Sequence, residues 1–359
     1  MKLIGKLLAY PLLAVNIVVA LLLIFSCYGS LLAPIGRWPF ASLSGLAFPF
    51  LYFLNFLFLI FWLFTWKKGS LVSAITVLIC LIPTLNYFPL HFSKAGKVRE
   101  PYLTIVSYNT EGFGIDDNKD WTTTNPVLNY ILGLDADIVF LQEVPHSVIN
   151  KAIHEKRITD QYPFNSTSKA VTSEACLSKY PIVYNEPVSF DNLGNSYMYL
   201  KILIDNDTLA VYNCHLQSNH LKDTEISEYQ RFIKNPTDSS HYDVSKKVLK
   251  KLLESTSQRA VQARNIADLA KTETAKYMIV CGDFNDTPLS YSHHLFNRFM
   301  KDAYAKSGVG MGITYHEHKL YYRIDHIFCS RNITPLHTWV DRTQKDSDHY
   351  PVFSKIRLE

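Results

Sequence analysis

The chain has 359 residues, of which 48% are hydrophobic and 19% are charged. Disorder requires low hydrophobicity and high net charge, so this composition excludes a disordered protein. The formal net charge of +4 is unevenly distributed, because residues 1–100 hold eight of the 36 Lys and Arg but one of the 32 Asp and Glu. The remaining 259 residues therefore carry 28 basic and 31 acidic side chains. This slight acidity argues against a broad basic surface that binds polyanions.

Three long apolar stretches, residues 7–32, 40–66 and 70–92, contain no Asp, Glu, Lys or Arg. Each is long enough to cross a bilayer, which takes about 20 apolar residues. A signal peptide is the alternative for the first stretch, but the apolar run exceeds the usual length of about 7–15 residues and two similar stretches follow. We therefore predict an integral protein of the cell or inner membrane, with three transmembrane helices in residues 1–92.

The orientation is predicted from the very short loop that contains Lys67 and Lys68. Basic residues in short loops favour the cytoplasmic side of a membrane. With three spans, the chain after residue 92 then lies on the extracytoplasmic side. Residues 93–101 are expected to form a linker and residues 102–359 a separate folded domain.

Short β-type runs alternate with helical patterns after residue 101. Helices are predicted at residues 126–134, 146–158 and 244–271, where apolar residues recur at helical spacing. Strands are predicted at residues 103–108, 138–142, 175–178, 182–184, 198–204, 208–215, 277–283, 323–329 and 351–356. This alternation indicates an α/β domain with many strands.

Polar side chains lie at or near the ends of six of these strands, the last of which they precede. They are Asn109, Glu111, Glu143, His215, Asp283, Asn285, Asp325, Asp348 and His349. Each has an ordinary explanation when taken alone, since acids cap helices and Asn or Asp form turns. Together they provide oxygen ligands for a hard cation, two imidazoles and a separate base. Side chains at strand ends gather at one rim of a sheet, so we predict a site there.

The segments around these side chains have recognisable sequences. They are SYNTE (107–111), LQEV (141–144), SKYPI (178–182), HL (215–216), GDFNDTP (282–288), YRIDHI (322–327) and SDHYPV (347–352). In this order they resemble the motifs of the endonuclease/exonuclease/phosphatase superfamily, which includes deoxyribonucleases, apurinic endonucleases, neutral sphingomyelinases and inositol polyphosphate phosphatases. The resemblance spans nearly all of residues 102–359. It implies a four-layer sandwich of two mixed β-sheets flanked by helices, and metal-dependent hydrolysis of phosphate esters.

The resemblance also implies roles for individual residues. Glu143 is the principal ligand of Mg²⁺, with Mn²⁺ as an alternative, and Asn109, Glu111 and Asp348 are further candidate ligands. Carboxylate and amide oxygens are the ligands that Mg²⁺ prefers. Several relatives have Asp where this chain has Glu111, and its longer side chain puts direct ligation in question.

The remaining roles concern the attacking water and the phosphate. Asp283 positions or deprotonates the water, and Asn285 helps to orient the water or phosphate. His349 bonds a phosphate oxygen and is held by Asp325. His215 matches a second histidine of the deoxyribonuclease and sphingomyelinase branches.

Other polar residues are open to simpler interpretations. Glu174 resembles a carboxylate that supports the second histidine in the deoxyribonuclease branch, and an exposed acid at a strand entry is the alternative interpretation. His293–His294 and residues 316–318 are expected to be surface loop residues, because neighbours one or two apart do not face one ligand. Residues 219–243 form a long polar insertion of the kind that shapes substrate access.

We predict a membrane-anchored phosphohydrolase that cleaves phosphodiester bonds. The first hypothesis is an endonuclease-like enzyme acting on nucleic acid. The second is an enzyme that acts on a phospholipid or a sphingomyelin-type phosphodiester, which the anchor and the slightly acidic domain favour. The third is a silent binding module that kept the fold. Every motif position is filled by a chemically competent residue, which argues against the third hypothesis.

Overall fold

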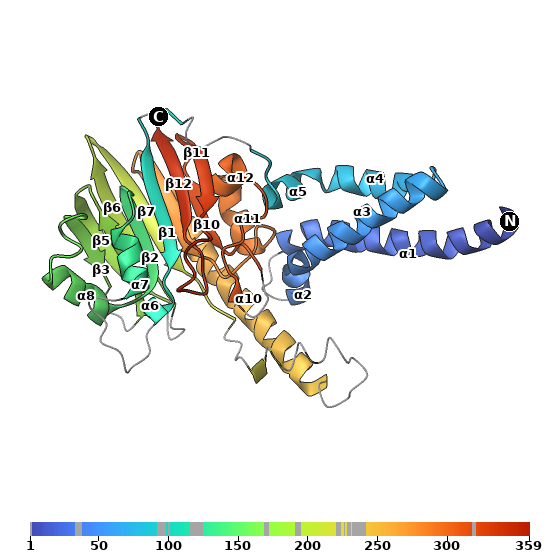
Figure 1. Ribbon diagram of the computed structural model, residues 1–359, viewed down its shortest axis with the longest axis horizontal. Helices are drawn as coiled ribbons and strands as arrows, with labels where there is room; N and C mark the ends of the chain where they lie inside the picture. The colour runs from blue at the N-terminus through green and yellow to red at the C-terminus, as the bar shows by residue number, and fades with distance from the viewer. Residues whose placement is uncertain are drawn as a thin grey trace.

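A computed structural model describes residues 2–32, 38–91, 98–99, 101–114, 125–168, 172–190, 195–219, 224–225, 227, 231, 242–317 and 321–359. Figure 1 shows a group of long N-terminal helices that extends from one side of a β-rich body. The predicted linker 93–101 and insertion 219–243 lie mostly outside the described residues.

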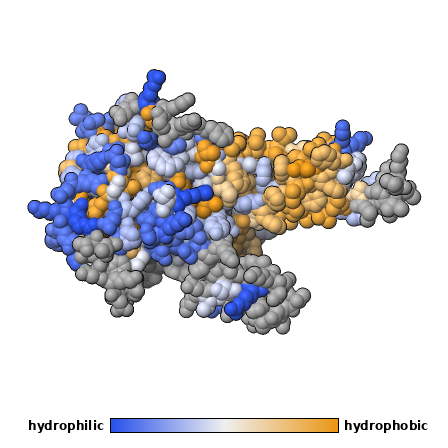
Figure 2. Space-filling model, in the orientation of Figure 1, coloured by the Kyte–Doolittle hydropathy of each residue, from blue (hydrophilic) through white to orange (hydrophobic). Residues whose placement is uncertain are grey.

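The N-terminal helices are strongly apolar on the outside, as Figure 2 shows. Two of them are long and apolar enough to cross a membrane, at Ala9–Leu31 and Phe40–Thr65. The third predicted span is a pair of shorter helices bent by 63°, which forms either one broken span or a re-entrant loop. The described helices are α1 (Lys2–Tyr28), η1 (Gly29–Leu31), α2 (Pro39–Leu43), η2 (Ser44–Ala47), α3 (Phe48–Thr65), α4 (Ser70–Ile79) and α5 (Leu81–Tyr87). Two or three spans are therefore compatible with the structure.

Buried polar side chains connect these helices. Asn16 of α1 donates to Ser73 Oγ of α4 at 3.0 Å, and Asn16 Oδ1 accepts from Trp62 Nε1 of α3 at 3.0 Å. Asn55 of α3 donates to the Ser73 carbonyl at 3.3 Å. Apolar helices gain no hydrophobic driving force from associating inside lipid, so such hydrogen bonds are a main source of specific packing there.

The β-rich body contains two six-stranded mixed sheets. The first has the order β11-β12-β1-β2-β4-β3, in which β1 and β2 are parallel. The second has the order β5-β6-β7-β8-β10-β9, in which β7 and β8 are parallel. The strands are β1 (Leu103–Asn109), β2 (Ile138–Pro145), β3 (Phe164–Thr167), β4 (Thr172–Ser178), β5 (Ile182–Ser189), β6 (Ser196–Ile204), β7 (Asp207–His215), β8 (Tyr277–Asp283), β9 (Lys301–Asp302), β10 (Asp325–Cys329), β11 (Ile333–Val340) and β12 (Val352–Leu358).

Helices cover the outer face of each sheet. The central apolar core lies between the sheets and includes Ile105, Phe140, Leu200 and Ile279. The helices of the body are α6 (Glu111–Gly114), α7 (Pro126–Leu132), α8 (His146–His154), α10 (Tyr242–Thr272), α11 (Tyr291–Asn297) and α12 (Ala303–Ser307). Helices α7 and α8 pack on the first sheet, and α10 and α11 pack on the second. The prediction of a four-layer α/β sandwich is confirmed.

Several contacts join the apolar N-terminal segment to the sandwich. Leu90 pairs with Val309 in a short antiparallel bridge. Arg323, which is buried, donates from Nη2 to the carbonyl of Asn86 in α5 at 2.6 Å, across 237 positions of sequence. Ser30 donates to the carbonyl of Leu289. The sandwich is thus packed directly against one end of the apolar N-terminal helices.

Candidate active site

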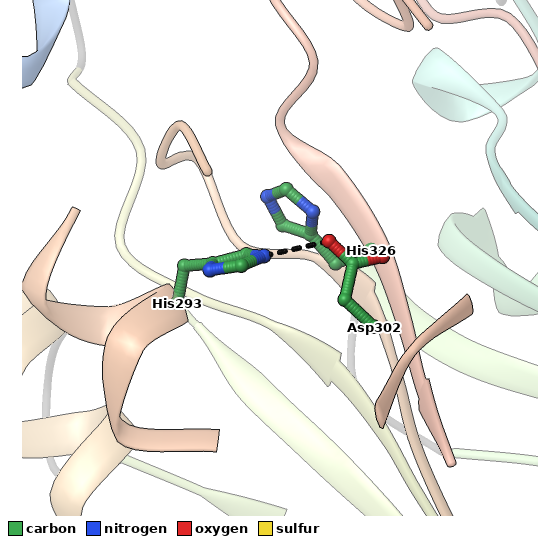
Figure 3. A group of neighbouring side chains, drawn as sticks. All are labelled: His293, Asp302 and His326. Carbon is green, nitrogen blue, oxygen red and sulfur yellow. Dashed lines mark hydrogen bonds and ion pairs between the residues drawn. The ribbon is translucent and has the colours of Figure 1, made fainter. Parts of the chain in front are cut away.

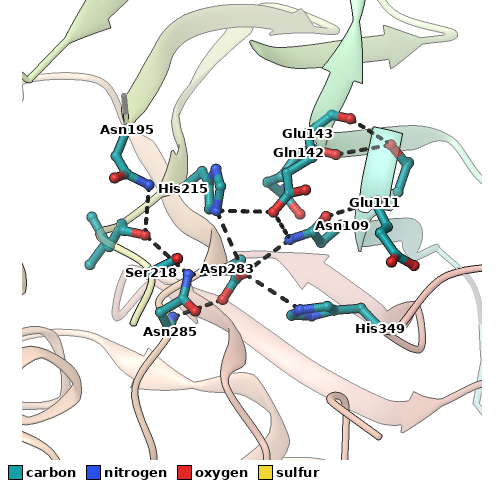
Figure 4. A network of polar contacts seen from close by, with 12 residues as sticks. Asn109, Glu111, Gln142, Glu143, Asn195, His215, Ser218, Asp283, Asn285 and His349 are labelled. Carbon is teal, nitrogen blue, oxygen red and sulfur yellow. Dashed lines mark hydrogen bonds and ion pairs between the residues drawn. The ribbon is translucent and has the colours of Figure 1, made fainter. Parts of the chain in front are cut away.

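Polar side chains from both sheets meet where the strands end. Asn109 ends β1 and pairs with Gln142 of the parallel strand β2. Glu143 follows Gln142 in β2. His215 and Asp283 end β7 and β8, which are parallel and place these two residues opposite each other. Parallel strands end at the same edge of a sheet, so the two pairs face each other across the sandwich. Figure 4 shows this network.

Glu143 projects from an irregular part of β2. Its backbone φ is 54°, and the pairing of β2 with β4 shifts register between Leu141 and Val144. A non-glycine residue in this left-handed region costs about 1–3 kcal/mol and often marks a functional site. The hydroxyl of Thr110 holds this backbone by donating to the carbonyls of Gln142 and Glu143, at 3.1 Å each. The bulge leaves the Glu143 carboxylate about one third exposed.

Asn109 connects two carboxylates. Its Nδ2 donates to Glu143 Oε1 and to Asp283 Oδ2, both at 3.0 Å. Its Oδ1 accepts from the backbone N–H of Glu111 at 3.1 Å. In this orientation the amide nitrogen, rather than the oxygen, faces the space between the carboxylates.

Asp283 is the deepest carboxylate of this network. Burial raises its pKa, and the nearby charge of His349 opposes the shift. Its Oδ1 accepts from the backbone N–H of Asn285 at 2.7 Å, and Oδ2 accepts from the Asn285 side chain at 3.2 Å. Asn285 also donates to the carbonyl of Leu216 at 3.1 Å. These contacts fix the direction of the Asp283 carboxylate.

Gly282 allows this carboxylate to reach the site. Its φ is +124°, and a Cβ at this position would lie 2.0 Å from the carbonyl oxygen of Cys214 on β7. We expect Gly282→Ala to lower the free energy of unfolding by about 3 kcal/mol or more, since the contact is with backbone that cannot move aside cheaply. Chemical denaturation of the full chain checks this, with Gly310→Ala as control, because Gly310 also has a positive φ of +77° but its Cβ would meet nothing within 4 Å. Equal destabilisation by both substitutions would contradict the steric argument.

His349 and Asp325 form a buried pair. His349 Nδ1 contacts Asp325 Oδ2 at 2.8 Å, while its Nε2 lies 3.7 Å from Asp283 Oδ2. Burial alone would lower the pKa of His349, but the carboxylates of Asp325 and Asp283 raise it well above the usual value. The ring of Tyr315 packs edge-on against His349 at 5.2 Å. The two carboxylates thus favour the charged form of the imidazole, and Nε2 is directed into the site.

His215 lies on the other side of Asp283. Its Nε2 is 3.3 Å from Glu143 Oε1 and 3.8 Å from Asp283 Oδ2. Glu174 is buried, so the interpretation as an exposed acid is wrong. Its carboxylate accepts from the hydroxyl of Ser196 at 2.7 Å, and Ser196 pairs with His215 across β6 and β7. Burial raises the pKa of Glu174, and the hydrogen bond from Ser196 opposes this shift.

Glu111 and Asp348 complete an acidic group around Glu143. The backbone N–H of Asp348 donates to Glu111 Oε2 at 2.8 Å. Burial raises the pKa of Glu111, and burial together with nearby carboxylates raises the pKa of Asp348 to about 7. Crowded carboxylates that raise one another's pKa favour a bound cation, and an all-oxygen set suits a hard divalent ion. The residues present therefore fit a hard divalent cation.

A second layer of polar contacts connects the sheets beneath the site. Gln142 Nε2 donates to Asn213 Oδ1 at 2.6 Å, and Asn213 Nδ2 donates to carbonyls of Leu141 and Ala175 at 3.0 and 3.1 Å. Ser347 donates to the carbonyl of Asn109 at 2.9 Å and so ties the loop before β12 to β1. Gln142 and Asn213 were not predicted as site residues. The sequence signal that could have identified these two residues is a polar side chain inside an otherwise apolar strand.

His293 corrects one prediction, because it is buried rather than part of a surface loop. Its Nε2 contacts Asp302 Oδ2 at 2.9 Å beside His326 (Figure 3). Asp302 Oδ1 accepts from the first N–H groups of α12, and Arg323 lies 4.0 Å from Oδ2. The charge of Asp302 is thus already balanced, which indicates a structural network. His316 is stacked on Tyr350, and residue 318 lies outside the described residues.

We expect Asp302→Asn to lower the free energy of unfolding by about 3 kcal/mol at neutral pH, because it removes the carboxylate beside the buried Arg323 guanidinium. His293 and Arg323 hold the pKa of this carboxyl below its usual value, although burial opposes them. Its contribution is therefore present above the ordinary carboxyl pKa of about 4 and is lost as pH falls below it. Urea titrations from pH 7 to pH 3 should show that the difference in the free energy of unfolding between wild type and Asp302→Asn becomes smaller as pH falls. A difference that is constant with pH would contradict this assignment.

Comparison with known proteins agrees with this fold. The sequence profile of the Endonuclease/Exonuclease/phosphatase family matches residues 106–349, so the chain belongs to this family. A second profile, for a domain of unknown function, matches residues 6–87. None of the curated proteins compared with the chain matches it.

Solved structures resemble the chain in fold at low sequence identity. TDP2 of D. rerio, complexed with a single-strand DNA product, is 15% identical with a TM-score of 0.52, over 72% of this chain and 100% of that chain. The human Nocturnin catalytic domain with bound sulfate is 14% identical with a TM-score of 0.51, over 73% and 95%. An endonuclease/exonuclease/phosphatase from Beutenbergia cavernae is 16% identical with a TM-score of 0.50, over 72% of each chain.

Proposed function

We propose that this protein is a membrane-anchored, Mg²⁺-dependent phosphodiesterase, with Mn²⁺ as an alternative metal. The observation that carries the proposal is the meeting of Asn109, Glu143, His215, Asp283 and His349 at one edge of both sheets. Residues 1–92 would form the anchor and residues 102–359 the catalytic domain, on the extracytoplasmic side.

The metal would bind at Glu143, with Glu111 and Asp348 beside it and Asn109 able to join by turning its amide through 180°. A divalent cation there supplies charge neutralisation at the phosphate and stabilises the leaving oxygen. A base is still needed to deprotonate water, and Asp283 suits this role because burial raises its pKa. Asn285 would orient the Asp283 carboxylate and the attacking water.

The two imidazoles would bind the phosphate. His349 Nε2 and His215 Nε2 both lie within 4 Å of Asp283 Oδ2, so they face the same space. Protonated His349 would donate a hydrogen bond to a phosphate oxygen whose charge grows in the transition state. Asp325 and, through Ser196, Glu174 would act as positioning residues.

Nucleic acid is the first proposed substrate. The D. rerio TDP2 of similar fold was solved with a single-strand DNA product, which supports a phosphodiester of this class. A membrane phosphoester is the second candidate. The contacts of Arg323 with Asn86 and of Val309 with Leu90 favour it, because they keep the site close to the lipid surface.

Substrate class can be tested with the full chain in nanodiscs. Nicking of supercoiled plasmid would be measured with Mg²⁺, with chelator, and with the Glu143→Ala variant. We expect nicking only by the wild-type protein in the presence of Mg²⁺. Metal-dependent release of phosphate esters from the disc lipids without nicking would favour the second candidate, and activity on neither substrate would contradict the proposal.

A further inference from the structure

Helix α10 leaves the sandwich next to the membrane helices. Its C-terminal half packs on the second sheet through Ala263, Ile266 and Ala267. The helix also contacts α2, which lies within the candidate span Phe40–Thr65. Figure 1 shows that α10 runs obliquely past this contact, so that its N-terminal end projects on the side from which the membrane helices extend. This end therefore lies near the level where the bilayer would begin.

The projecting end is basic. Residues 246–254 read KKVLKKLLE, with four lysines and one glutamate. Lys246 and Lys250 are one helical turn apart, as are Lys247 and Lys251, so the four occupy one side of the helix. Val248 on the opposite side is buried. The basic charge is thus concentrated on the exposed side.

Two of these lysines are held by an internal partner, and two face outwards. Glu225 pairs with Lys247 at 3.1 Å and with Lys251 at 2.6 Å. Lys250 is 76% exposed and reaches only the exposed Glu254, at 3.7 Å. Leu249, one helical turn from Lys246, is 40% exposed although it is a large apolar residue. Lysines around an exposed leucine are typical of a helix that lies at a membrane surface.

We infer that the N-terminal end of α10 binds anionic lipid headgroups, an inference that rests on the proposed membrane insertion. Lys246 and Lys250 would contact the headgroup phosphates. Leu249, beside these lysines, would enter the interfacial layer of the bilayer. The attraction is electrostatic and falls off within a Debye length, so it requires the helix to lie at the surface. The contact with α2 provides that placement. Bound in this way, α10 would fix the tilt of the sandwich above the bilayer.

Hydrogen exchange of the full chain in nanodiscs tests this inference. Discs of zwitterionic phosphatidylcholine would be compared with discs containing 30% phosphatidylglycerol, a probe composition on the order used for anionic membranes. We expect amide exchange in residues 246–254 to slow at least about fivefold in the anionic discs, and high salt to remove the difference. The double variant Lys246→Gln/Lys250→Gln should lose the effect.

Lys271→Gln is the matched control, because Lys271 is an exposed lysine at the other end of α10 that pairs with Asp268. It should behave as wild type. Equal exchange in both lipids, or protection that persists in the double variant, would overturn the inference. Protection by added single-strand DNA instead of anionic lipid would also overturn it and assign the basic end to nucleic acid. Hydrolysis measured in the same discs reports on the proposed function separately, since the lysines are outside the site.

Discussion

Asp283→Ala is expected to lower kcat by about 10³-fold or more while the fold remains intact. The substitution removes the proposed base and the acceptor that holds Asn109 and Asn285, and positioned bases contribute roughly 10²–10⁴-fold. The measurement is the rate of phosphodiester hydrolysis under saturating metal. Thermal unfolding of the same samples separates loss of chemistry from loss of structure.

Two further variants make this test specific. Asp283→Asn keeps the shape of the side chain without a base and should be nearly as slow as Asp283→Ala. Asp346→Asn changes an exposed carboxylate two residues before Asp348 and should retain wild-type rates. A rate within about tenfold of wild type for Asp283→Asn would remove Asp283 from the role of base.

The second large effect concerns His349 and its partner Asp325. His349→Ala should lower kcat by about 10²–10³-fold, the usual cost of losing one donor to a developing oxyanion. Asp325→Asn should be milder at neutral pH but should change the pH profile. Asp325 helps to raise the pKa of His349, so its loss lowers that pKa. The charged donor is present below this pKa and is lost as pH rises through it. As pH rises, activity should therefore begin to decline at a lower pH in Asp325→Asn than in wild type.

The pH dependence of kcat/KM for both proteins checks this prediction. The alkaline limb of the wild-type profile should lie at higher pH than that of Asp325→Asn. Coincident alkaline limbs would show that Asp325 does not act through the charge of His349. A shift confined to KM would point to substrate binding rather than to transition-state stabilisation.

The sandwich could be predicted from the sequence because its central strands are continuous apolar runs. The predicted strand 277–283 coincides with β8, and the long helix predicted at 244–271 corresponds to α10. The edge strand β11 was missed. It contains Pro335, which cannot donate to a ladder and is tolerated only at an edge or bulge, and the pairing shifts register there. Edge strands carry little periodic signal for this reason.

The residues of the candidate site could be predicted because each lies at or near the end of a strand within a recognisable motif. Their supports are harder to find, since Gln142 and Asn213 meet across 71 positions of sequence between two sheets. His293 was misjudged for a related reason. The pair His293–His294 looks exposed, but Asp302 and the turn into α12 bury the first histidine. The bend between α4 and α5 was also not predicted. The sequence across this bend shows no clear break in hydropathy.

The central claim is that hydrolysis depends on a divalent cation held by Glu143. The most direct measurement is the rate of bis(p-nitrophenyl) phosphate hydrolysis by the chelated full chain as Mg²⁺ is added back, for wild type and Glu143→Gln. We expect no hydrolysis without metal, full recovery in wild type, and recovery in the variant only at a Mg²⁺ concentration about tenfold or more higher. Hydrolysis that resists chelation, or the same metal dependence in both proteins, would contradict the account.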